Sequence, residues 1–175
     1  MKAQEAHIDA FALNIAKDDP VNDKALPMFF DVADEQGFQL FFSFDYAGNG
    51  PWDMGDVIEL INKYAGRDSY YHYSGQPFVS TFEGPENSDD WLAIKQATGC
   101  FFVPDWSSLG AKPAVELGTA DGLFNWAAWP WGPQEMNTYV DASYIEYLNG
   151  LPYMMPASPW FYTNLPGYKK NWLWR

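Results

Sequence analysis

The stretch Phe38-Gln39-Leu40-Phe41-Phe42-Ser43-Phe44-Asp45 decides the fold, because it is a continuous apolar run that ends in a carboxylate. The stretch Pro77-Phe78-Val79-Ser80-Thr81-Phe82-Glu83 has the same shape. A run without polar alternation is typical of a strand covered on both faces, as in a parallel sheet flanked by helices. Ligands bind at the carboxyl ends of such strands. The sequence therefore predicts two acids, Asp45 and Glu83, at a ligand-binding edge.

Strands and helices alternate along the chain. Apolar runs and helical spacing predict six strands, at 8–14, 38–45, 77–83, 100–103, 122–126 and 153–155, with helices near 23–36, 57–64, 88–97 and 141–148. We expect Gly37 to end the first helix and Ser88 to cap the third. Right-handed crossovers make the sheet parallel, and a complete (β/α)8 barrel takes roughly 250 residues. We predict an α/β fold of the TIM-barrel type, incomplete with about six βα units, in one partial domain over residues 1–175.

The composition favours a neutral ligand. The net charge is −13, with 23 acidic and 10 basic residues, so nucleic acid and anionic membranes would be repelled. Aromatic residues make up 19% of the chain, including nine tryptophans, and such rings stack on the apolar faces of sugars. No apolar stretch has the roughly 20 residues of a membrane helix, and the amino terminus shows no apolar segment of a secretory signal.

The acids at the strand ends are the candidate catalytic residues. Glycosidases place two carboxyl groups across the scissile bond, roughly 5 Å apart for retention and 6.5–9.5 Å for inversion. Asp45 and Glu83 are the predicted pair, with Asp105 and Asn14 as predicted substrate contacts at the ends of their strands. The alternative is that each acid is a hydrogen-bonded loop residue near a helix start, and Pro104 favours that alternative for Asp105.

Aromatic side chains near the strand ends are candidate stacking surfaces. We predict that four of them bind substrate: Tyr46, Trp106, Trp129 and Trp160. Trp52, Trp131 and Tyr162 have similar positions. The alternative for each ring is packing in the core or in a lid.

Other chemistries have little support in the sequence. His7 and His72 have no partner at metal-ligand spacing, and the single cysteine, Cys100, precedes an apolar run and allows no intrachain disulfide. No Gly-x-Ser-x-Gly elbow and no glycine-rich phosphate loop follows a strand. We predict no metal and no cofactor, and no feature indicates an oligomeric state.

Several segments resemble glycoside hydrolase family 71, the fungal α-1,3-glucanases or mutanases. The resemblance runs in order over essentially the whole chain, through segments at 8–14, 40–45, 79–84, 153–156, 159–166 and 170–175. It implies a (β/α)8 barrel that cleaves the α-1,3-glucan of fungal cell walls, with inversion and without a cofactor. It also implies a secreted or cell-wall location, with α-1,3-glucan as the partner.

The resemblance also bears on individual positions. Asp45 and Glu83 match family positions at the active-site face, which implies that they are catalytic-site or glucan-contacting residues. Members of the family are expected to begin one strand and helix earlier, and to continue into an eighth strand with an Asp-x-x-Glu pair. His7 stands where the family is expected to have glycine.

Three hypotheses follow for the chain. The first is a hydrolase of α-1,3-glucan that uses acid and base carboxylates. The second is a non-catalytic or vestigial barrel that binds glucan through its aromatic residues. The third is a fragment that does not fold by itself, because an open barrel exposes two sheet edges.

Overall fold

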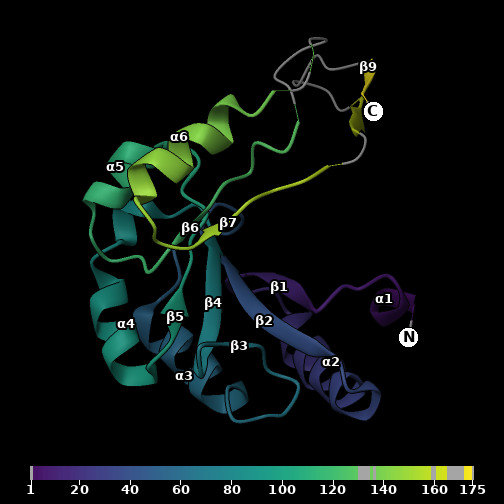
Figure 1. The fold of residues 1–175 in the computed structure, drawn as a ribbon. Coiled ribbons are helices and arrows are strands. Elements are labelled where there is room, and N and C mark those ends of the chain that lie inside the picture. Colours follow the sequence, from purple (N-terminus) through teal and green to yellow (C-terminus); the bar gives the residue numbers. More distant parts are fainter. Residues whose placement is uncertain (1, 130–134, 136, 159–160, 165–171, 175) are drawn as a thin grey trace.

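A wall of parallel strands forms the centre of the molecule (Figure 1). The computed structural model describes residues 2–129, 135, 137–158, 161–164 and 172–174. Within these residues, six parallel strands follow one another in chain order: β1 (Ala10–Ala16), β2 (Gln39–Asp45), β4 (Gln76–Phe82), β5 (Phe101–Phe102), β6 (Leu123–Phe124) and β7 (Tyr153–Met154). Single bridges from Asp105 to Phe82 and to Phe124 join β1–β5 to the β6–β7 pair. The predicted incomplete barrel is confirmed.

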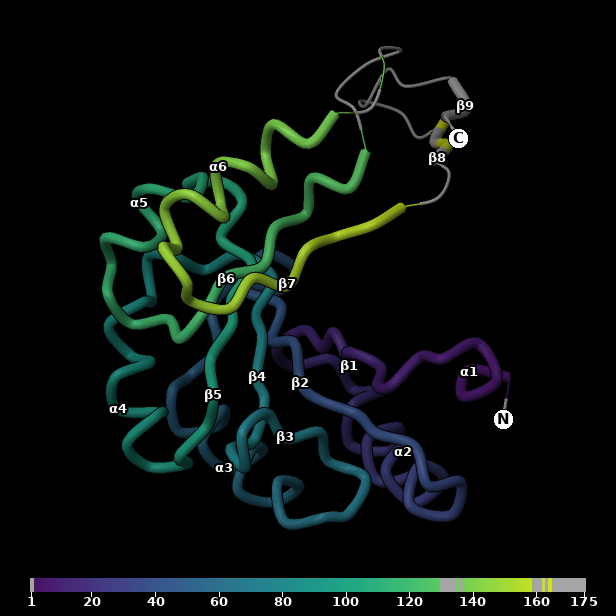
Figure 2. Tube along the Cα trace, in the orientation of Figure 1, coloured from purple at the N-terminus to yellow at the C-terminus, as the bar shows by residue number. Residues whose placement is uncertain are grey.

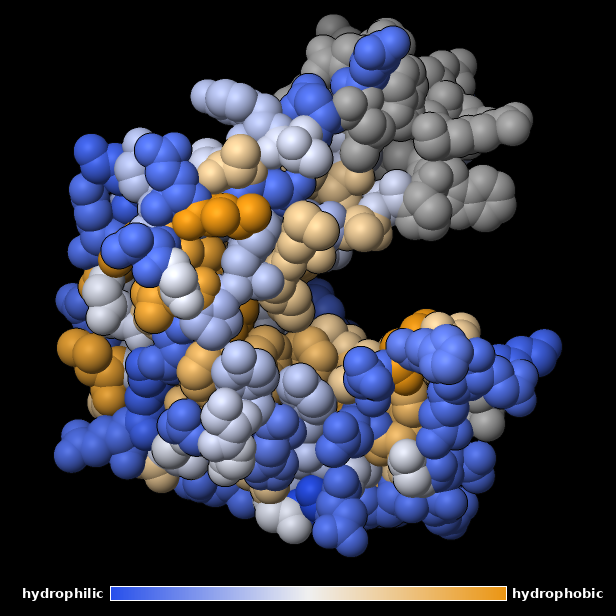
Figure 3. Space-filling model, in the orientation of Figure 1, coloured by the Kyte–Doolittle hydropathy of each residue, from blue (hydrophilic) through white to orange (hydrophobic). Residues whose placement is uncertain are grey.

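Helices cover the outer side of this wall, while the molecule is hollowed on the other side (Figures 1 and 3). The helices are α2 (Asn22–Gln36), α3 (Met54–Tyr64), α4 (Asp90–Thr98), α5 (Ala111–Glu116) and α6 (Tyr139–Leu148). The remaining elements are α1 (Lys2–Glu5), the 3-10 helix η1 (Pro85–Asn87), β3 (His72–Tyr73) antiparallel to β4, and the antiparallel pair β8 (Phe161–Thr163) and β9 (Trp172–Trp174). Figure 2 shows β1 and β7 as the two ends of the wall, and no described strand pairs with the outer edge of either.

The register of β2 with its neighbours arranges the inner face in three tiers. From the amino to the carboxyl ends of the strands, they are Phe41, Phe78 and Phe101, then Asn14, Ser43 and Ser80, and finally Asp45, Phe82 and Asp105. The lowest tier is aromatic, and the Phe41 and Phe78 ring centroids lie 4.9 Å apart. In the middle tier the Ser43 hydroxyl donates to Asn14 Oδ1 at 3.0 Å. Polarity therefore rises toward the predicted ligand-binding edge.

The outer face carries the main hydrophobic core. Phe42 alternates with the inner-face residues of β2 and packs against Phe30 of α2, with ring centroids 5.7 Å apart. Phe102 of β5 stacks on Trp91 of α4, with ring centroids 3.6 Å apart and an interplanar angle of 6°. All four rings are fully buried. The outer-face residues Leu40, Phe42 and Phe44 of β2 are thus buried and apolar, whereas its inner face becomes polar toward Asp45.

Local signals in the sequence place most helix ends correctly. Gly37 ends α2 as predicted, with a φ of 60° that glycine adopts readily. The prediction that Ser88 caps the third helix is wrong: Asp89 precedes α4, and no side chain caps it. Ser88 instead closes η1, a turn that begins at Pro85, and its side chain is buried. The sequence analysis also missed α5 and β3.

The stacked pair of Trp91 and Phe102 provides a test of the core. We expect Trp91→Ala to lower the free energy of unfolding by about 3–5 kcal/mol, because it leaves a large cavity between α4 and β5. Urea unfolding measures this loss. Leu92→Ala is the matched control on the same helix, since Leu92 is exposed and its loss should change stability by about 0.5 kcal/mol or less. Equal losses in the two variants would contradict this description of the core.

Candidate active site at the strand ends

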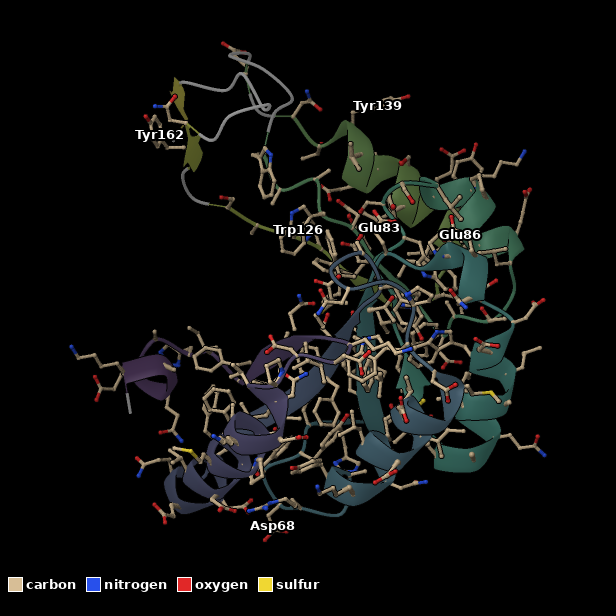
Figure 4. The ribbon with its side chains drawn as sticks, turned by 180° about the vertical axis from the view of Figure 1, so that it is seen from behind. Asp68, Glu83, Glu86, Trp126, Tyr139 and Tyr162 are labelled. Carbon is tan, nitrogen blue, oxygen red and sulfur yellow. The ribbon has the colours of Figure 1, made fainter. Side chains whose placement is uncertain are left out.

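The acidic residues predicted from the sequence share one edge of the strand wall. Asp45 ends β2 and pairs with Phe82 of β4, so Glu83 follows one residue beyond the same level. Asp105 lies on the other side of Phe82, and its backbone oxygen accepts the N–H of Glu83 at 2.8 Å. Neighbouring strands are about 5 Å apart. The structure therefore brings Asp45, Glu83 and Asp105 to one short stretch of the edge, and Figure 4 shows Glu83 there, far from Asp68.

Asp45 holds the turn that follows β2. Its Oδ1 accepts the backbone N–H groups of Ala47 at 2.9 Å and Gly48 at 2.8 Å, which makes an Asx turn. Its Oδ2 accepts Nδ2 of Asn14 at 3.2 Å. Asn14 is exposed and lies one tier below Asp45, so it ties β1 to β2 beside the predicted binding edge.

Glu83 is held differently from the other acids. Its Oε1 accepts the backbone N–H of Ser108 at 3.1 Å, and its Oε2 accepts the Ser108 hydroxyl at 2.5 Å. The carboxylate therefore extends to the segment after β5 and, unlike that of Asp45, accepts no hydrogen bond from its own turn within the described residues. The backbone of Glu83 has a φ of 56°, a left-handed conformation that costs a non-glycine residue about 1–3 kcal/mol. Strain of this kind concentrates at functional sites.

Gly84 allows this strained turn to pack closely against the side chain of Tyr46. Its φ is 86°, and a Cβ at this position would overlap the ring of Tyr46. The tight turn from Glu83 to Gly84 borders a cavity of about 460 Å³. Its lining includes Tyr46, Glu83, Glu86, Asn87 and Ser108. The Glu83 carboxylate thus lies beside a space that a ligand group could enter.

Asp105 is the acid that the fold buries completely. Its Oδ1 accepts the backbone N–H of Ser107 at 3.1 Å and also the Ser107 hydroxyl, while Oδ2 has no hydrogen-bond partner within the described residues. Burial raises the pKa of Asp105 to about 6, with the Ser107 hydrogen bonds opposing the shift and the charge of Glu83 adding to it. Burial, together with the nearby Asp105, also raises the pKa of Tyr144 to about 12. Asp105, predicted as a substrate contact, thus has no exposed surface, and its contact with a ligand stays a prediction.

Two of the predicted stacking rings also lie in the core. Trp106 is 1% exposed and its ring packs against Phe102, with centroids 5.7 Å apart. Tyr46 is 6% exposed and lies against Gly84. Both rings are therefore largely covered by protein, Tyr46 also lines the cavity beside Glu83, and sugar binding by either ring stays a prediction. Trp129 is partly exposed, while Trp160 lies outside the described residues.

Trp126 is a further candidate contact that was not predicted from the sequence. The predicted strand at 122–126 would end at Trp126, but β6 ends at Phe124. Asn125 Oδ1 then accepts the N–H of Ala127 at 2.7 Å, so the chain turns and leaves Trp126 50% exposed. Asparagine two residues before a small residue is a turn signal that could have revealed this. Figure 4 shows Trp126 at the same end of the sheet as Glu83.

In the described ranges, no group of three or more His, Cys, Asp or Glu side chains is arranged to hold a metal ion. None of the described helices combines the length and apolar character that crossing a membrane requires.

The turn held by Asp45 yields a stability prediction. Asp45→Ala removes the acceptor for two backbone N–H groups and for the Asn14 side chain. We therefore expect the free energy of unfolding to fall by about 2 kcal/mol. Asp45→Asn keeps an oxygen at the Oδ1 position and should lose less than half as much. Chemical unfolding of both variants measures the difference. A loss of the same size in both would show that the turn does not depend on Oδ1.

The buried Asp105 yields a pH prediction. Its folded-state pKa of about 6 lies above the usual 3.8, so the folded state keeps the proton longer than the unfolded state. This contribution lowers the free energy of unfolding by about 2 kcal/mol as the pH rises from 4 to 7. Asp105→Asn should abolish that part of the pH dependence, whereas Glu146→Gln removes an exposed carboxyl as the control. Unfolding in urea at pH 4, 5, 6 and 7 tests this, and an unchanged slope in Asp105→Asn would refute it.

Comparison with known proteins identifies the family. The model of Glycosyl hydrolase family 71 matches residues 1–175. A mutanase of Penicillium rubens is 36% identical over 182 residues, which cover 98% of this chain and 39% of the mutanase. A glucan endo-1,3-alpha-glucosidase of Schizosaccharomyces pombe is 34% identical over 186 residues, which cover 95% of this chain and 43% of that enzyme. The chain thus spans about two fifths of the length of these relatives.

Solved structures resemble the fold. A family 99 endo-alpha-mannosidase of Bacteroides thetaiotaomicron superposes with a TM-score of 0.65 at 14% sequence identity, over 90% of this chain and 51% of that chain. Its complex with BIS-TRIS-propane gives a TM-score of 0.61 at 13% identity, over 87% of this chain and 52% of that chain. At such low identity the likeness concerns the fold alone. Because the family model matches all of residues 1–175, the chain belongs to glycoside hydrolase family 71.

Proposed function

We propose that the protein hydrolyses α-1,3-glucosidic bonds in a glucan, with carboxylates at the strand ends as its acid and base groups. The observation that carries the proposal is the family match over all 175 residues. The printed names of the two relatives, a mutanase and a glucan endo-1,3-alpha-glucosidase, support this substrate. The net charge of −13 also suits an uncharged polymer better than an anionic one. We further propose that the protein is secreted or held in a fungal cell wall, where such a polymer would be met.

Glu83 is the proposed proton-transferring residue of this chain. A general acid or base must reach the glycosidic oxygen or the attacking water within hydrogen-bond distance. Glu83 lies beside a cavity, and Ser108 fixes both of its oxygens from one side. Asp45 is the proposed second carboxylate, oriented by Asn14 and the turn after β2. Its second oxygen, Oδ2, has one protein donor, so it can still accept a hydroxyl of the sugar.

A second candidate function is glucan binding without hydrolysis. The specific observation in its favour concerns the other two acids: Asp45 accepts hydrogen bonds from its own turn, and Asp105 is buried. Of these three acids, Glu83 is therefore the one best placed to transfer a proton, and hydrolysis needs two such groups. Binding would then rest on exposed aromatic side chains near the edge.

The substitution Glu83→Gln tests the proposed hydrolysis. It keeps the size of the side chain and one acceptor oxygen for Ser108, but it removes the ionisable group. We expect the protein produced from its complete reading frame to release reducing sugar from α-1,3-glucan, and Glu83→Gln to lower the rate by about 10²–10⁴-fold.

The control is Asp68→Asn, which removes an exposed carboxylate at the opposite end of the molecule (Figure 4). It should leave the rate unchanged. A wild-type protein that sediments with insoluble α-1,3-glucan but releases no sugar would favour the binding function instead. A Glu83→Gln variant that retains the full rate would remove Glu83 from the catalytic assignment.

A further inference from the structure

We propose that Trp126 is a sugar-stacking surface of the site, and that Ser107 is its positioning residue through a hydrogen-bond chain anchored on Asp105. This inference deepens the proposed function and rests on it. The ligand is a pyranose ring of the neutral glucan, whose apolar face can lie on the indole.

Trp126 has the exposure and the neighbours of a binding surface. It is 50% exposed, whereas Trp91 and Trp106 are buried. Its ring meets Phe82 with centroids 5.4 Å apart at 69°, and Phe82 directly precedes Glu83. The rings of Phe124 and Trp129 also meet it nearly edge to face, at 6.0 Å and 6.1 Å. These contacts hold the indole in place while half of the residue stays exposed.

The backbone of Trp126 is fixed by Ser107. The N–H of Trp126 donates to Ser107 Oγ at 2.7 Å, and the Ser107 hydroxyl lies within hydrogen-bond reach of Asp105 Oδ1. The direction of this chain follows from the chemistry of the groups. A backbone N–H can only donate, so Oγ accepts from it and has its single proton left for the carboxylate. The buried carboxyl of Asp105 thereby helps to set the position of the exposed ring that follows β6.

A second, partly buried network holds the other side of the same turn. Asn125 is almost fully buried, and its Nδ2 donates to the hydroxyl of Tyr153 on β7. That hydroxyl in turn donates to Asp141 Oδ1 at 2.6 Å, at the start of α6. The Asn125 Oδ1 accepts the N–H of Ala127. A chain of hydrogen bonds thus runs from α6 through β7 to Asn125, the residue that directly precedes Trp126.

Glu83 and Trp126 are linked through the same segment. Ser108, which binds the Glu83 carboxylate, directly follows Ser107, which binds the Trp126 backbone. The segment after β5 thus sets the acid and the ring relative to each other. A sugar stacked on Trp126 would then be placed relative to the acid by two consecutive serines.

Binding of soluble α-1,3-gluco-oligosaccharides, measured by calorimetry beside hydrolysis rates, tests the inference. Trp126→Ala should weaken binding roughly tenfold and raise KM by a similar factor with little change in kcat, because stacking contributes equally before and during reaction. Tyr147→Ala is the matched control, since Tyr147 is 43% exposed on α6 and should not affect binding.

A double-mutant cycle tests the role of Ser107. Ser107→Ala should weaken binding about fivefold or more. It should cost nothing further in the Trp126→Ala background, and Ser107→Thr, which keeps the hydroxyl, should restore binding. Thermal melting of each variant reports whether it is folded. Unchanged binding in Trp126→Ala, or additive losses in the double variant, would overturn the inference while leaving the proposed function standing. Absence of wild-type binding and hydrolysis would overturn both.

Discussion

The pairing of β2 with β1 on one side and β4 on the other is the constraint on which the structure depends. Because the residues of these strands alternate between the helix-covered core and the inner face, a shift of one residue would exchange the two sets. The register of Asn14 with Ser43, and of Asp45 with Phe82, places the polar residues on the inner face. The same register sets Glu83 one step beyond Asp45. The geometry of the candidate site is therefore a consequence of core packing behind the sheet.

The long elements were predictable from sequence because their signals are local. A seven-residue strand buried on both faces has an unmistakable composition, and Gly37 marks a helix end by its backbone freedom. The short strands β5, β6 and β7 have two residues each, so their limits depend on which neighbour they pair with rather than on composition. The helix α5 was missed for a similar reason. It has six residues with Pro113 in the middle, and two alanines buried by tertiary packing stabilise it.

The candidate site was predictable in its acids and not in its aromatic residues. A strand end is visible in the sequence, so the positions of Asp45 and Glu83 follow directly. The direction of a ring after the strand depends on the turn, and turns here rotate Trp106 into the core and Trp126 toward solvent. Both follow a side chain that bonds to a backbone N–H two residues on, Asp105 in one case and Asn125 in the other. The same local motif thus gives opposite outcomes, and the packing around each turn decides between them.

Side-chain length explains why Glu83 differs from its neighbours along the edge. Asp45, Asp105 and Asn125 have short side chains that return to their own backbone, which stabilises the turn and occupies an oxygen. Glutamate has one more methylene group, and at Glu83 it extends away from its turn to Ser108. The left-handed backbone there has no compensating bond from its own side chain, so the surrounding structure must maintain it. Glycine would adopt this left-handed conformation at lower cost, but it would remove the carboxylate that Ser108 holds.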